Sequence, residues 1–153
     1  MFVHHMIPHH QQAIQMSDIV LSKQGIDPRV VDLANKIKAA QQPEIEQMQS
    51  WLTQWGQPTM PMMPSGSMMP SRSMMPGMGM MSEADMAALQ NAQGVDASKL
   101  FLQQMIQHHQ GAIAMAKTEI DTGQYPAAVE LAQSITTSQQ QEIDTMQSIL
   151  ASL

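Results

Sequence analysis

Two histidine pairs, His9-His10 and His108-His109, are the residues of this sequence best suited to binding a metal, because methionines flank both of them. Thioether sulfur is a soft ligand that suits Cu(I) and Ag(I), whereas imidazole suits copper and zinc. A thioether does not titrate, so a mixed site keeps part of its ligand set at acidic pH, where histidine begins to protonate. The candidate ligands are Met6, His9, His10, Met16 and Met48 in the first half, and Met105, His108, His109, Met115 and Met146 in the second.

One glutamate in each half, Glu44 or Glu142, belongs to the same pattern. A carboxylate can ligate a metal itself, or it can accept a hydrogen bond from a ligating histidine and orient that ring, and the second role is favoured. For the helical methionines the alternative is plain packing, because Met fills irregular gaps in a core. The role of His4 and His5 stays open, because the second half carries Gln103-Gln104 at the equivalent positions.

Residues 56–81 form a separate segment that is rich in Met, Pro and Gly. Pro and Gly at this density disfavour helix and strand, so a flexible linker is predicted, disordered without a ligand. The alternative is a generic linker that binds nothing. Met is an unusual choice for such a linker, because it is apolar and prone to oxidation. Clustered thioethers can instead wrap a soft ion. The ligands predicted here are Met60, Met62, Met63, Met68, Met69, Met74, Met75, Met78, Met80 and Met81.

The composition argues against several classes of protein. The net charge is −6 and the pI is about 5.3, which argues against a nucleic-acid partner, since phosphates bind basic surfaces. The sequence has no Cys, so disulfides, thiolate zinc sites, iron–sulfur clusters and cysteine nucleophiles are excluded. No apolar run reaches about 18 residues, so no membrane span is predicted. No signal peptide is visible at the start of the chain.

An internal duplication accounts for the paired motifs, since residues 6–16 recur at 105–115 and residues 44–52 recur at 142–150. Each copy has the periodicity and punctuation of two amphipathic helices, and a lone hairpin buries too little surface to be stable. An all-α fold is therefore predicted, an antiparallel four-helix bundle made of two helical hairpins joined by the Met-rich linker. The predicted helices cover about 2–21, 28–55, 98–120 and 126–150, and the predicted segments are hairpin 1–55, linker 56–81 and hairpin 82–153.

Helical periodicity places each histidine pair on one face with its neighbouring methionines, and places Glu44 and Glu142 on faces of the following helices. These faces are predicted to point toward the bundle interior or its edge. Pro8 and Pro43 have no proline counterpart in the second copy. A proline inside a helix kinks it, so the two sites are predicted to differ in geometry, unless Pro8 marks the first turn of a helix that begins late.

The motifs M-I-x-H-H-x-x-A-I-x-M, L-A-x-x-I and Q-x-x-E-I-x-x-M together resemble a bacterial family catalogued as a domain of unknown function with a ferritin-like four-helix fold. Two copies joined by a Met-rich segment are similar to its CopM-like copper-binding members, over nearly all of the chain outside the linker. The resemblance implies a periplasmic or extracellular copper-resistance factor whose signal peptide, and the residues just before Phe2, are missing from this chain. A di-iron site is not expected, because no Glu-x-x-His occurs.

The leading interpretation is a non-enzymatic protein that binds Cu(I), and also Ag(I) or Cu(II), and lowers free copper outside the cytoplasm. Metal ions are its expected partners, and the sequence identifies neither a protein that donates or accepts copper nor an oligomeric state. Two alternatives stay open. A copper-dependent oxidase would need an open coordination position and redox cycling. A metal-free bundle would use Met-rich patches to bind other proteins.

Overall fold

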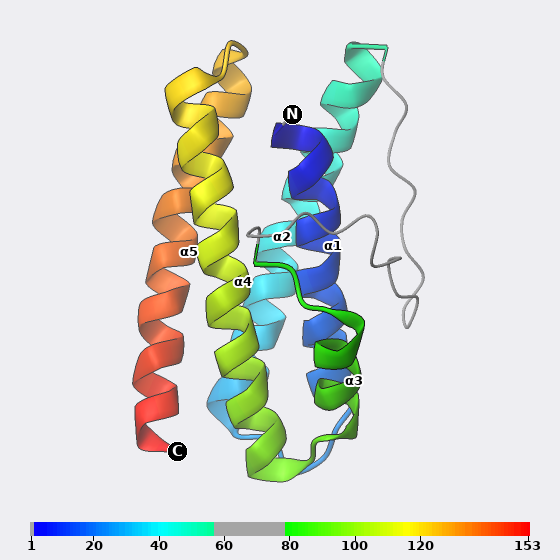
Figure 1. Cartoon of the computed structure of the whole chain (residues 1–153), viewed down its shortest axis with the longest axis vertical. Coiled ribbons are helices and arrows are strands. Elements are labelled where there is room, and N and C mark those ends of the chain that lie inside the picture. The colour runs from blue at the N-terminus through cyan, green and yellow to red at the C-terminus, as the bar shows by residue number, and fades with distance from the viewer. Residues whose placement is uncertain (1, 57–78) are drawn as a thin grey trace.

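The computed structural model describes residues 2–56 and 79–153, and within these ranges it contains five helices and no strand (Figure 1). Helices α1 and α2 form one hairpin, and α4 and α5 form the other. The four long helices make the bundle predicted from the duplication. The bounds are α1 (Phe2–Leu21), α2 (Pro28–Gln54), α3 (Glu83–Asn91), α4 (Gly94–Thr122) and α5 (Pro126–Ser152).

The two hairpins meet along α1 and α4, which run in opposite directions (Figure 1). Helices α2 and α5 each pack mainly against their own hairpin partner. The short helix α3 lies beside the half of the bundle that is away from the N-terminus, and it contacts both α1 and α4. The inner pair of helices therefore consists of the two that carry the histidine motifs.

Two of these helices, α2 and α3, begin at capping signals that are local in the sequence. The Asp27 carboxylate accepts a hydrogen bond of 2.9 Å from the Arg29 N–H, and Pro28 occupies the first helical position of α2. Ser82 and Asp85 form a reciprocal capping box in which each side chain accepts a 3.1 Å bond from the other residue's N–H. Short-range chemistry is enough to specify both starts.

Three details differ from the predictions. Helix α4 begins at Gly94 and not near residue 98, and a separate helix α3 precedes it. Ser98 is buried inside α4, where its hydroxyl donates to the Gly94 carbonyl and accepts from the Asp27 N–H, so a residue typical of caps serves as an interior contact. Pro8 lies inside α1, which begins at Phe2, so the reading that this helix begins late is wrong.

The core consists of two hydrophobic clusters with buried polar side chains between them. One cluster includes Val20, Leu33 and Phe101, and the other includes Ile45 and Trp51. Along each long helix, buried polar residues lie between the residues of one cluster and most residues of the other. We call this set the polar layer, and it consists of His9, His10, Gln41, His108, His109 and Gln139, all at most 3% exposed.

Residues 79–82, which we call the docking segment, lie against the inner helices. The Gln12 side chain binds the backbone of Met81 twice, donating to its carbonyl at 3.0 Å and accepting from its N–H at 2.8 Å. Gly79 approaches α4 so closely that a Cβ would lie 2.6 Å from the Gln107 carbonyl and 3.0 Å from the Gly111 Cα. Gln12 and Gly111 are equivalent in the duplication, so the two copies differ where the segment crosses them.

Met81 is 1% exposed and belongs to the hydrophobic cluster that contains Phe101. The sequence placed this residue, with Gly79 and Met80, at the end of the flexible linker, whereas the structure places it in the core. The rest of the predicted linker from residue 57 to residue 78 lies outside the described residues.

Gly79→Ala is expected to release the docking segment, whereas Gly56→Ala is not. Both glycines have a positive φ, +74° and +70°, so an alanine at either site costs about 1–2 kcal/mol of backbone strain. Only at position 79 does the added Cβ also collide with α4. We expect hydrogen exchange of the Met81 N–H to speed up by about tenfold or more in Gly79→Ala alone. Equal exchange rates in the two variants would show that the segment does not depend on this close approach.

Candidate metal centre

Four imidazoles meet where α1 and α4 pack together. The rings of His9 and His108 lie against each other with their centroids 3.7 Å apart and their planes tilted by 37°. His10 and His109 follow them on the same helices, and all four side chains are at most 1% exposed. Each of these two rings comes from a different copy of the repeat, so the duplication assembles one cluster and not two separate ones.

Each outer histidine is held by the glutamate of its own copy. The Nε2 atom of His10 lies 2.7 Å from Glu44 Oε1, and the Nε2 atom of His109 lies 2.6 Å from Glu142 Oε1. An ionised carboxylate can only accept, so Nε2 carries the hydrogen and donates it, and the lone pair is on Nδ1. Glu44 and Glu142 thus fix the ring orientation and the tautomer in the way that suits a ligating histidine.

Several nitrogens in this cluster are buried without a hydrogen-bond partner. They are Nδ1 of His10, Nδ1 of His109 and both ring nitrogens of His108. Buried polar atoms are usually paired, so unpaired ones at a shared location call for an explanation, and a metal ion supplies one. The described residues include no ready-made group of three or more His, Asp or Glu side chains around a common point. A metal here would therefore draw on imidazole nitrogens together with thioether sulfurs.

The electrostatic environment keeps the central histidine neutral. Burial lowers the pKa of His108 well below its usual value of 6.5, because an imidazolium would lose its hydration, and the nearby His9, His109 and His10 lower it further. A neutral imidazole is the form that ligates a metal. His108 therefore stays in this form at pH values where an exposed histidine would be protonated.

The six candidate methionines of the four long helices are buried in two groups that mix the copies. One hydrophobic cluster holds Met6, Met48 and Met115, and the other holds Met105, Met146 and Met16. In the duplication Met6 corresponds to Met105, Met48 to Met146 and Met115 to Met16, so each trio contains the counterparts of the other. The sequence assigned Met6 and Met16 to one set of ligands, whereas the structure places them in different clusters on either side of the polar layer.

Other candidate residues lie apart from this cluster or outside the described ranges. His4 and His5 are half-buried near the start of α1, and burial lowers the pKa of His5. Met80 is half-buried in the docking segment. The predicted linker ligands Met60, Met62, Met63, Met68, Met69, Met74, Met75 and Met78 lie outside the described residues.

Two glutamines of the polar layer were not singled out from the sequence. Gln41 and Gln139 are 3% and 2% exposed, and the Oε1 atom of each is buried without a hydrogen-bond partner. Both begin the repeated Q-x-x-E motif, one helical turn before Glu44 and Glu142. The signal available in the sequence was the repetition of this glutamine in both copies.

The DUF305 family, a domain of unknown function, matches residues 1–150 of this chain. The chain belongs to the DUF305 family. A DUF305 fragment from Deinococcus radiodurans is 36% identical with a TM-score of 0.84, and the match covers 99% of this chain and 94% of that one. A DUF305 protein from Streptomyces coelicolor, proposed to be secreted, is 34% identical with a TM-score of 0.83, over 99% and 89%.

Structures of CopM are also similar to this DUF305 protein. The Cu(I)-bound form is 30% identical with a TM-score of 0.77, and the Cu(II)-bound form is 33% identical with a TM-score of 0.78. Both matches cover 99% of this chain and 94% of CopM. CopM has also been solved with Ag bound. No curated protein sequence matches this DUF305 protein.

These findings confirm the resemblance to CopM-like proteins and the helical fold that it implied. They place the chain in a family with a member that binds copper and silver. Among the described residues, no helix is long and apolar enough to cross a membrane.

Proposed function

We propose that this DUF305 protein binds Cu(I), and also Ag(I) or Cu(II), through the imidazoles of its polar layer. The observation that carries this proposal is the contact of His9 in α1 with His108 in α4, ring centroids 3.7 Å apart, beside buried ring nitrogens of His10, His108 and His109 that have no hydrogen-bond partner. The likeness to CopM, which is known with Cu(I), Cu(II) and Ag bound, supports the choice of metal. His9, His10, His108 and His109 are the proposed nitrogen donors.

Thioethers on both sides of the polar layer would complete the coordination. Met6, Met48 and Met115 lie in one adjoining cluster, and Met105, Met146 and Met16 lie in the other. Imidazole together with thioether favours Cu(I) and Ag(I) over Zn(II), since zinc in proteins is typically held by Cys, His or carboxylate. The Met-rich segment, with the thioethers named above, is proposed to capture further ions.

Binding without catalysis is the proposed role. The histidines are at most 1% exposed, whereas an oxidase acting on an external substrate needs an open coordination position. We propose that the protein works in the periplasm or outside the cell, where it lowers free copper and so contributes to copper resistance. The DUF305 relative from Streptomyces coelicolor that is proposed to be secreted supports this location.

Anaerobic titration of Cu(I) against bathocuproine, with Ag(I) and Zn(II) in parallel, tests the proposal. We expect at least one tightly bound Cu(I) per chain, similar retention of Ag(I), weak retention of Zn(II), and a higher Tm with bound metal. A variant with serine in place of the eight methionines between residues 60 and 78 should keep the helical site. Binding of less than one Cu(I) per chain, or no loss of bound Cu(I) when both histidine pairs are replaced by alanine, would contradict the proposal. Oxygen consumption by the copper-loaded protein would favour the oxidase instead.

A further inference from the structure

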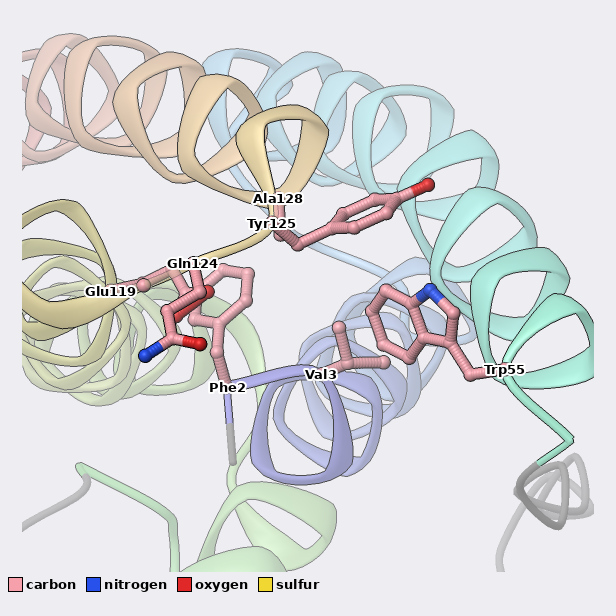
Figure 2. Close-up of a pocket in the computed structure, with 8 residues that line it drawn as sticks. Phe2, Val3, Trp55, Glu119, Gln124, Tyr125 and Ala128 are labelled. Carbon is pink, nitrogen blue, oxygen red and sulfur yellow. The ribbon is translucent and has the colours of Figure 1, made fainter.

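A second candidate site lies at the end of the bundle where α1 begins and α4 turns into α5. A cavity of about 340 Å³ opens there, and residues from α1, α2, α4 and α5 contribute to its wall (Figure 2). This volume is in the range of small-molecule sites. The side chains that give the cavity its chemical character are Phe2, Trp55, Glu119 and Tyr125. None of them belongs to the polar layer, so the inference does not rest on the proposed metal binding.

Aromatic rings are concentrated around this cavity. The chain has two Trp, one Tyr and two Phe, and of these five only Phe101 lies in the other hydrophobic cluster. The rings of Trp55 and Tyr125 are 4.8 Å apart at 81°, and Trp51 supports both at 6.2 and 5.6 Å. Two nearly perpendicular rings form a corner. Figure 2 shows the ring of Phe2 across the cavity from Trp55.

One carboxylate lies at the same cavity. Glu119 is in the last turn of α4, and its side chain is folded over Gly123, where an added Cβ would lie 2.6 Å from Oε1. Gly123 therefore leaves the space that the carboxylate occupies. Partial burial raises the pKa of Glu119, because the anion has lost part of its hydration. Among the residues that line the cavity, Glu119 is the one acidic side chain, and none is Lys, Arg or His.

Aromatic faces around a cavity with a single carboxylate make a recognition set for a cation with an apolar surface. The negative faces of Trp, Tyr and Phe attract a quaternary ammonium, whose methyl groups also bury apolar area against the rings. A small inorganic cation such as Ca²⁺ takes about six to eight oxygen ligands, whereas the oxygen-bearing side chains that line this cavity are those of Glu119, Gln124 and Tyr125, and only Glu119 has a carboxylate. We propose that this pocket binds a methylated ammonium group.

Choline and its neutral isostere 3,3-dimethylbutan-1-ol distinguish a cation site from a merely apolar pocket. Both tryptophans belong to the aromatic cluster at the pocket, so intrinsic fluorescence of the 153-residue chain reports occupancy directly. We expect saturable binding of choline at millimolar concentration, about tenfold tighter than binding of the isostere at equal ionic strength. Copper-free and Cu(I)-loaded protein should give the same affinity for choline. The outcome is therefore independent of whether the metal centre proves correct.

Two variants and one control assign the effect to the pocket. Glu119→Gln removes the charge and Trp55→Leu removes one ring, and each should weaken choline binding by about tenfold. Glu83→Gln removes an exposed carboxylate from the first turn of α3, which lies beside the other half of the bundle, and should leave choline binding unchanged. Circular dichroism checks that Trp55→Leu folds, and Glu119→Gln keeps the test decisive if it does not.

Co-sedimentation with lipid vesicles distinguishes a lipid headgroup from a free solute as the source of the ammonium group. Co-sedimentation with phosphatidylcholine but not phosphatidylglycerol vesicles, abolished by Glu119→Gln, would identify a lipid headgroup. Binding of free choline without co-sedimentation would identify a small solute. Equal affinity for choline and the neutral isostere, or no saturable response to choline, would overturn the proposal.

Discussion

His108→Leu is expected to stabilise the metal-free protein, although it replaces a fully buried residue in the core. Both ring nitrogens of His108 are buried without a partner, and such groups cost about 1–3 kcal/mol. Leucine fills a similar volume without that cost, so we expect Tm to rise by about 2–4 °C for each kcal/mol gained. Cu(I) affinity should fall by about 100-fold or more, since loss of a ligand exceeds loss of a group that only orients one. Thermal unfolding and chelator competition measure the two effects.

The same variant should flatten the pH dependence of stability. Because the folded-state pKa of His108 is lowered from 6.5, the unfolded chain takes up a proton that the folded chain refuses as pH falls below that value. The unmodified protein therefore loses stability in this range, and His108→Leu should lose less. His4→Leu, at a half-buried position near the start of α1, serves as the control and should not change the copper affinity. A loss of stability on His108→Leu would show that its nitrogens are paired in solution.

Glu142→Ala is expected to lower Cu(I) affinity by about 10–100-fold, because it removes the acceptor that orients His109. It should also destabilise the metal-free protein by about 1–3 kcal/mol, since the Nε2–H of a fully buried ring then loses its partner. Glu142→Gln keeps a carbonyl oxygen at the same position and should retain most of the affinity and stability.

The comparison of the two substitutions separates an orienting carboxylate from a ligand. If Glu142 binds the metal with its own charge, glutamine should fail as badly as alanine. Asp144→Ala, at an exposed position two residues further along α5, is the matched control and should have little effect on either measurement. The equivalent pair of substitutions at Glu44 should reproduce the pattern, because His10 and Glu44 have the same geometry.

Local chemistry made much of the fold predictable. The repeat gave the number of long helices, the Asp27-Pro28 and Ser82–Asp85 signals located helix starts, and helical periodicity placed the histidines and methionines on buried faces. The break between α3 and α4, and the start of α4 at Gly94, were missed, since Ser98 is buried inside α4 by a contact with the distant α1–α2 turn.

For the candidate site too, part of the arrangement was predictable from the sequence and part was decided by how the helices pack. Spacing along the sequence grouped the ligands by copy, since i, i+3 and i+4 positions share a helix face. Periodicity says which face is buried, but it does not say which residue of another helix will be opposite. The antiparallel packing of α1 on α4 decides that His9 lies against His108 and that Met115 joins the cluster of Met6.

The sequence by itself determined the bundle, the inward histidines and the carboxylate partners Glu44 and Glu142, because all of these follow from short-range periodicity and a repeated motif. Only the tertiary structure decided that the two histidine pairs form one cluster and that Gln12 and Gly111, which differ between the copies, both contact the docking segment. It also decided that aromatic side chains from different helices surround a cavity with Glu119. Each of these depends on contacts between residues far apart in the chain, and their positions are fixed by how whole helices pack.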